Sequence, residues 1–83
     1  MRSIVDFEKF ANNLLEGYSP SPLPSKPLLY SGETINSSIS NLYSVLTNYC
    51  HLFSGEKEIK EKIILDTCLK LQNLYEEENK KRS

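Results

Sequence analysis

The chain has 83 residues, a formal net charge of −1 and two cysteines. A chain of this length forms one domain, the lack of a basic excess argues against nucleic acid as the main ligand, and two cysteines are too few for a disulfide scaffold. Folds this small often gain stability from a partner or a second copy, so association with another protein is expected.

The sequence carries no sign of secretion or membrane insertion. Charged residues within residues 1–15 interrupt the apolar run that a signal peptide needs. The longest uncharged stretch, residues 34–55, holds too many Ser, Asn and Thr residues to span a bilayer. We therefore expect a soluble, intracellular protein, cytoplasmic or nuclear, in which Cys50 and Cys68 are free and pack as small apolar side chains.

In chain order, the first predicted element is a helix over residues 3–16. Its apolar residues follow the three- and four-residue spacing of one helix face, and they are Ile4, Phe7, Phe10, Ala11, Leu14 and Leu15. Ser3 is expected to cap the first turn and Asp6 to favour the positive end of the helix dipole. Gly17 is expected to end the helix.

Residues 18–32 are predicted to form an extended connector. They contain all four prolines, and proline lacks a backbone donor and restricts the residue before it. The connector ends in three apolar residues, Leu28, Leu29 and Tyr30, which we expect to strap it to the helices.

Two short patterns in the connector leave another role open. Residues 24–27 read PxxP, and Ser-Pro pairs stand at 19–20 and 21–22. Such patterns fit a recognition or phosphorylation site, but they also arise by chance. A stiff structural spacer is the favoured interpretation.

A helix over residues 34–54 carries the clearest pattern in the chain. Its main apolar positions are spaced by four and three residues, a heptad-like seam, and they are Ile35, Ile39, Leu42, Leu46, Tyr49 and Phe53. Tyr43, Val45, Cys50 and Leu52 widen the seam to about half the circumference. The other half is polar and formally uncharged, so it is expected to face solvent.

The third predicted helix covers residues 56–78 and follows a Ser54-Gly55 turn, which predicts an antiparallel hairpin with the second helix. Its broad apolar face consists of Ile63, Ile64, Cys68, Leu71, Leu74 and Tyr75. Leu65 and Leu69, one turn apart, fall outside that face. They are expected to need cover from the first helix or from another molecule.

Charge is concentrated in the last third of the chain. Residues 56–83 hold 14 of the 21 charged side chains, seven acidic and seven basic, so the third helix is expected to have a solvated outer face. The basic residues 80–82 fit a helix end, where the dipole favours cations. A patch for localisation or for an acidic partner is the alternative.

Residue types suited to catalysis or metal binding do not come together in the sequence. His51 is the single histidine, and it follows Cys50 directly, so on a helix the two side chains project about 100° apart and cannot form a dyad. The chain has no CxxC or HExxH spacing for zinc and no glycine-rich phosphate loop. We therefore predict no cofactor, no metal site and no enzymatic activity.

These observations predict an all-α protein, a small three-helix bundle built on an antiparallel hairpin that is crossed by a shorter first helix. At 1.5 Å per residue the first helix is about 20 Å long and the other two about 30 Å. It cannot cover the whole hairpin, so the Leu28–Tyr30 strap, a second copy or a partner's helix is expected to fill the rest.

The predicted function is that of a non-enzymatic protein–protein interaction subunit or adaptor, which packs helices against a partner or a second copy. The alternatives are a small helical regulator that blocks an enzyme and a nucleic-acid-binding accessory protein. Most of the candidate partner-binding residues are expected to belong to the intramolecular core, and the candidates are Ile39, Leu42, Leu46, Tyr49, Phe53, Leu65, Leu69 and Tyr75.

Overall fold

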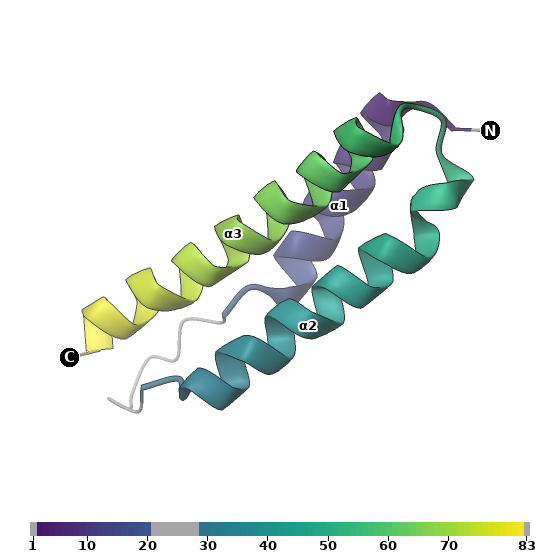
Figure 1. Cartoon of the computed structure of the whole chain (residues 1–83). Coiled ribbons are helices and arrows are strands. Elements are labelled where there is room, and N and C mark those ends of the chain that lie inside the picture. Colours follow the sequence, from purple (N-terminus) through teal and green to yellow (C-terminus); the bar gives the residue numbers. More distant parts are fainter. Residues whose placement is uncertain (1, 21–28, 83) are drawn as a thin grey trace.

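A computed structural model describes residues 2–20 and 29–82. In chain order the elements are α1 (Ile4–Tyr18), α2 (Gly32–Tyr49), the short 3-10 helix η1 (Cys50–Leu52) and α3 (Lys57–Arg82). Figure 1 shows α2 and α3 as an antiparallel hairpin, with α1 lying behind both. The predicted all-α three-helix bundle is confirmed.

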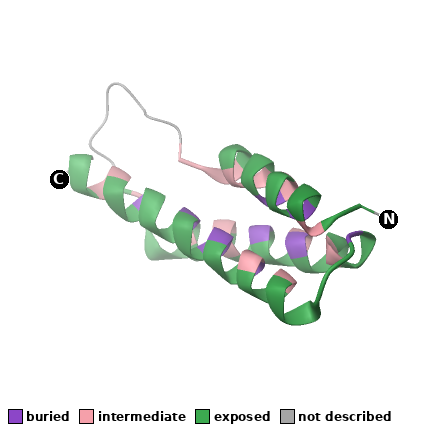
Figure 2. Ribbon diagram, turned by 90° about the horizontal axis from the view of Figure 1, so that it is seen from above, coloured by how far each residue is buried: buried purple, intermediate pink, exposed green. Residues whose placement is uncertain are grey.

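The core lies where the three helices face one another (Figure 2). Each helix contributes at least one fully buried side chain, and these are Phe7, Leu42, Leu46 and Leu71. Aromatic rings close one end, where the Phe7 ring centroid lies 5.0 Å from that of Phe53 and the Phe10 centroid lies 5.6 Å from it. Burial of these apolar surfaces is the main force that holds α1 against the hairpin.

The first helix begins as predicted and ends later. The Ser3 Oγ accepts a hydrogen bond from the backbone N–H of Asp6 at 3.2 Å, and the Asp6 carboxylate accepts one from the Ser3 N–H at 3.3 Å. The prediction that Gly17 ends the helix is wrong, because α1 continues to Tyr18. Ser19 is extended (φ −65°, ψ 148°), as the proline that follows it requires.

The second helix begins earlier than its predicted start at residue 34. Ser31 takes the N-cap position, and its Oγ accepts a hydrogen bond from the backbone N–H of Thr34 at 3.1 Å. Gly32 is therefore already the first residue of α2. The sequence prediction missed this cap and so placed the helix start too late.

The second helix also stops before its predicted end at residue 54. The α-helix ends at Tyr49, η1 follows, and Phe53 is extended (φ −119°, ψ 142°). The Lys60 ammonium donates to the carbonyls of Cys50 at 3.2 Å and Phe53 at 2.9 Å. These bonds satisfy carbonyls that a continuing helix would have paired internally.

A short backbone bridge fixes the chain just after η1. Arg2 and Phe53 form an isolated parallel bridge, and the N–H of Ser54 donates to the carbonyl of Arg2 at 2.6 Å. The residues before α1 thus occupy the position that a longer second helix would have needed.

The third helix was predicted over residues 56–78. In the structure α3 runs from Lys57 to Arg82, so it has 26 residues and ends later than predicted. Its last turns hold the segment just before α2 through Asn79, whose side chain accepts from the N–H of Tyr30 at 2.7 Å and donates to the carbonyl of the same residue at 3.0 Å. The basic residues 80 and 81 lie within the helix, where the dipole favours their charge.

Tyr18, Tyr30, Tyr75 and Asn79 form what we call the tyrosine clasp at the end of the bundle where α1 ends. The Tyr75 ring meets the Tyr30 ring edge-on, with centroids 5.0 Å apart. The Tyr75 hydroxyl donates to the carbonyl of Tyr18 at 3.2 Å and lies 3.0 Å from the Ser38 hydroxyl. The clasp therefore ties the residues on both sides of the proline-rich segment to one helix.

The predicted strap is confirmed only for Tyr30. Leu29 is exposed, and Leu28 lies outside the described residues, as do the PxxP pattern and the second Ser-Pro pair. Of the first pair, Ser19 donates its hydroxyl hydrogen to the carbonyl of Leu15 at 2.6 Å, so it acts as a local cap in this structure.

We expect Asn79→Ala to lower the free energy of unfolding by about 1–2 kcal/mol, because it leaves the N–H and the carbonyl of Tyr30 without this partner. Urea unfolding followed by circular dichroism measures the change. Asn73→Ala is the matched control, since Asn73 is an exposed residue of the same helix and should change stability by less than about 0.5 kcal/mol. Equal stability of the two variants would contradict the claim that the Asn79–Tyr30 hydrogen bonds stabilise the fold.

Candidate protein-interaction surface

Most of the residues that the sequence nominated for partner binding lie in the core of this chain. Leu42, Leu46, Phe53 and Tyr75 are buried, and Ile39 is half-buried against them. Their apolar surface is already used to pack α2 and α3 together and to hold α1. A partner could reach these side chains only if the bundle opened.

Tyr49 lies on the side of α2 that faces α1. Its side chain is 48% exposed, and its ring meets the edge of Phe10 with centroids 5.8 Å apart. Together with Arg2, Leu52 and buried Phe53 it lines a hollow of about 420 Å³. The exposed part of Tyr49 therefore continues the aromatic end of the core.

Leu65 and Leu69 stand apart from the other candidates. Their side chains are 61% and 55% exposed, although leucine is among the residues most often buried. From the sequence, we expected either the first helix or another molecule to cover these two leucines. In the structure α1 packs on the other side of α3, so it leaves both leucines in solvent.

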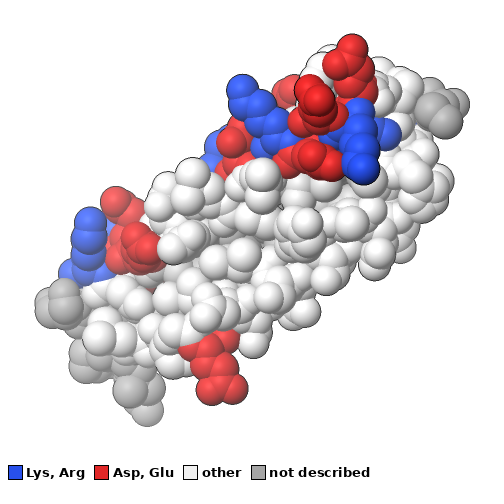
Figure 3. Space-filling view, in the orientation of Figure 1, with Lys and Arg blue, Asp and Glu red and all other residues white. Residues whose placement is uncertain are grey.

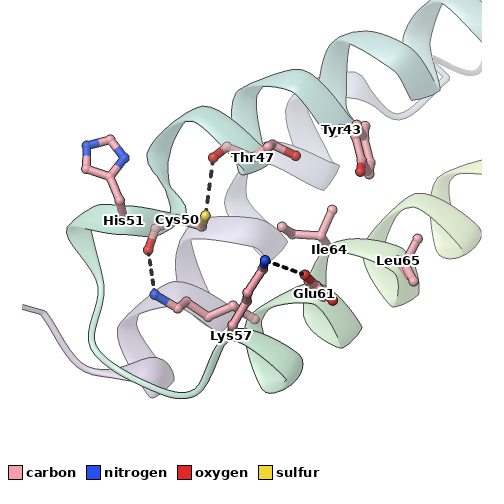
Figure 4. A pocket seen from close by; sticks show the side chains of 9 residues that line it. Tyr43, Thr47, Cys50, His51, Lys57, Glu61, Ile64 and Leu65 are labelled. Atoms are coloured by element: carbon pink, nitrogen blue, oxygen red, sulfur yellow. Dashed lines mark hydrogen bonds and ion pairs between the residues drawn. The ribbon is translucent and has the colours of Figure 1, made fainter.

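A hollow of about 550 Å³ opens between α2 and α3 beside Leu65. Tyr43, which is 48% exposed, points from α2 toward α3, and Leu65 lies on α3 opposite it (Figure 4). Buried Ile64 forms part of the floor. We call this hollow, together with Leu69 one turn further along α3, the α2–α3 groove.

Charged residues border the groove at one end. The Lys57 ammonium and the Glu61 carboxylate form an exposed ion pair at 3.9 Å, and Lys60 is held by its two carbonyl contacts. Figure 3 shows a large group of charged side chains at the upper edge of this face, a smaller group toward its left end and a separate acidic group at its lower edge, with an uncharged band between them. Residues 34–55 of the sequence carry no charge, which accounts for the uncharged surface along α2.

Tyr43 is an exposed aromatic residue of the groove that was not among the candidates predicted from the sequence. It was assigned to the flank of the apolar seam, 100° around the helix from Leu42. Tyr43 precedes Cys50, which also lines the groove, by seven residues, or about two helical turns. This spacing was the feature of the sequence that could have placed the two side chains on one face. Tyr43 on α2 and Cys50 at the start of η1 both lie on the side that faces α3.

The groove has little of the chemistry that catalysis requires. The Cys50 thiol donates to the carbonyl of Thr47 at 3.2 Å. The His51 ring points away from the Cys50 sulfur (Figure 4), so the two side chains do not form a dyad. Burial raises the pKa of the Cys68 thiol, which favours its unreactive protonated form. Among the residues that the structure describes, no group of three or more His, Cys, Asp or Glu side chains could hold a metal ion.

Fold and surface together define a small all-α three-helix bundle with an apolar groove left open along its hairpin. No family model, curated protein or solved structure matches the chain. Within the described residues, every helix is too short or too polar to cross a membrane.

Proposed function

We propose that this protein is a non-enzymatic interaction subunit or adaptor that binds a helix of another protein chain in the α2–α3 groove. The observation that carries the proposal is the exposure of Leu65 and Leu69, 61% and 55%, beside a hollow that Tyr43 borders from the other helix. Neighbouring apolar side chains in an open groove are typical of helix-in-groove recognition.

The energetics favour a bound partner. Complete burial of a leucine side chain is worth about 1.5–3 kcal/mol relative to exposure. Single exposed apolar residues are common on protein surfaces, but here two leucines one turn apart adjoin a concave apolar surface. Such continuous patches mark interaction sites more often than isolated residues do.

The uncharged band across this face supports the same function. Interface centres are depleted of charged residues, whereas the rim is polar. The groove has this arrangement, because Lys57 and Glu61 stand at one end of an apolar centre. Removing the centre from water therefore requires little desolvation of charge.

Affinity capture tests the proposal with three forms of the full chain as bait in extract of the cells that produce it: wild type, Leu65→Glu/Leu69→Glu and Val5→Glu. Val5 is the matched control because it is 56% exposed on α1, away from the groove. Both variants add glutamate to a helix surface, where its helix propensity is close to that of leucine. Circular dichroism and thermal unfolding confirm that each bait is folded.

We expect the double variant to lose the captured chain, while Val5→Glu retains it as wild type does. A glutamate in the groove would have to be desolvated on binding, which costs several kcal/mol. Equal recovery with all three folded baits would contradict the groove as the binding surface.

A further inference from the structure

We propose that the occupant of the surface around Leu65 and Leu69 is a second copy of this chain, with the two α3 helices packed antiparallel about a twofold axis near Leu69. This proposal rests on the proposed function, since it names the partner of the same surface. The reasons are the pattern of exposed residues along α3 and the signs of their charges.

Within the broad exposed surface of α3, one stripe of residues runs along the helix on both sides of the two leucines. Its residues are spaced by four, three, four, three and four positions, and they are Glu58, Lys62, Leu65, Leu69, Gln72 and Glu76, all of them exposed. Helices that pair side by side use this spacing. Here the centre of the stripe is apolar and both ends are polar, as in an isolated helix-pairing surface.

The charges on the stripe favour one orientation. Lys62 and Glu76 stand seven residues to either side of Leu69, about two helical turns. An antiparallel pair places Lys62 of one copy beside Glu76 of the other, and twofold symmetry makes this contact twice. A parallel pair would instead place Lys62 beside Lys62 and Glu76 beside Glu76, which like charges disfavour.

Side-chain contacts within the chain are compatible with this pairing. The Gln72 amide donates to the Glu76 carboxylate at 3.2 Å, which keeps that carboxylate on the exposed stripe. The same arrangement brings Glu58 toward the last turns of the partner helix, which carry Lys80 and Lys81. Leu69 meets its own copy at the axis, and Leu65 packs beside it.

The length of α3 makes such a pair feasible. With 26 residues, the helix is about 39 Å long and is the longest in the described part of the chain. A stable pair buries about 800 Å² on each partner, and the adjoining groove with Tyr43 adds apolar surface to the helix contact. Small folds often gain stability from a second copy.

Sedimentation equilibrium of the full chain tests the proposal, using wild type, Lys62→Glu, Glu76→Lys and an equimolar mixture of the two variants. Wild type should form dimers. Each single variant places like charges at both contacts and should weaken the dimer by roughly tenfold or more. In the mixture both contacts again join opposite charges, so heterodimers should form with nearly the wild-type affinity.

The Val5→Glu variant is the control and should dimerise as wild type does, and circular dichroism confirms that every variant is helical. A wild-type chain that stays monomeric up to about 100 µM would overturn the proposal. Charge variants that dimerise unchanged, or a mixture that fails to recover, would overturn the antiparallel pairing. If the chain is monomeric while Leu65→Glu/Leu69→Glu still loses a captured protein, the proposed function stands and the partner is a different chain.

Discussion

Phe7→Ala is expected to lower the free energy of unfolding by about 3–5 kcal/mol, the range for a buried phenylalanine. A domain of this size has only about 5–15 kcal/mol of stability to lose. The variant should therefore show a strongly lowered urea midpoint, and a fraction of it should be unfolded without denaturant. Urea unfolding followed by circular dichroism measures the effect.

The large loss of stability expected for Phe7→Ala follows from the position of Phe7 in the core, where its side chain packs between α1, the hairpin and the segment after η1. Its side chain is fully buried, and its ring centroid lies 6.5 Å from that of Phe10 and 5.0 Å from that of Phe53. Truncation removes the ring contact between Phe7 and Phe53 and leaves a cavity that the helices close only in part.

Val5→Ala is the matched control for Phe7→Ala. Val5 belongs to the same helix but is 56% exposed, so its truncation should change stability by less than about 0.5 kcal/mol. A Phe7→Ala variant as stable as Val5→Ala would contradict the packing of α1 against the hairpin.

Gly55→Ala is expected to destabilise the protein by about 1–3 kcal/mol, the cost of a strained backbone conformation. Gly55 has φ +128°, which side-chain-bearing residues rarely adopt, and a Cβ there would lie 3.0 Å from the Cδ1 of Ile4 and 3.3 Å from its Cβ. The turn before α3 passes against the start of α1, so an added methyl group must displace one of them.

Gly17→Ala is expected to stabilise the protein, whereas Gly55→Ala destabilises it. Gly17 lies within α1, and a Cβ there would meet no atom within 4 Å. Alanine should therefore raise the free energy of unfolding by about 0.5–1 kcal/mol. Thermal unfolding of both variants should show melting temperatures on opposite sides of wild type, and a shift of both in one direction would contradict the assigned backbone conformations.

The buried faces of the helices were predictable from the sequence because apolar residues spaced by three and four positions lie on the same side of a helix. Leu42 and Leu46 are one turn apart on α2, Cys68, Leu71 and Tyr75 are spaced by three and four residues on α3, and all five are buried. The helix ends were less predictable. The end of α2 depends on the Arg2 backbone and the Lys60 side chain, which come from distant parts of the sequence, whereas the cap of α1 involves two residues three positions apart.

The groove was predictable only in part. The angular positions of Leu65 and Leu69 placed them outside the buried face of α3, and both are exposed. The sequence could not show on which side of the hairpin α1 packs, so the exposure of Tyr43 was missed. The uncovered surface was expected at the end beyond the first helix, but Tyr30 and Tyr75 occupy that end, and the groove runs along the side.

The most direct test of the central claim, that the α2–α3 groove is the surface through which this protein binds another chain, is the recovery of bound chain by folded Leu65→Glu/Leu69→Glu relative to folded Val5→Glu. We predict recovery at least about tenfold lower with the groove variant, in keeping with the loss of central interface contacts. Equal recovery by the two variants would contradict the claim.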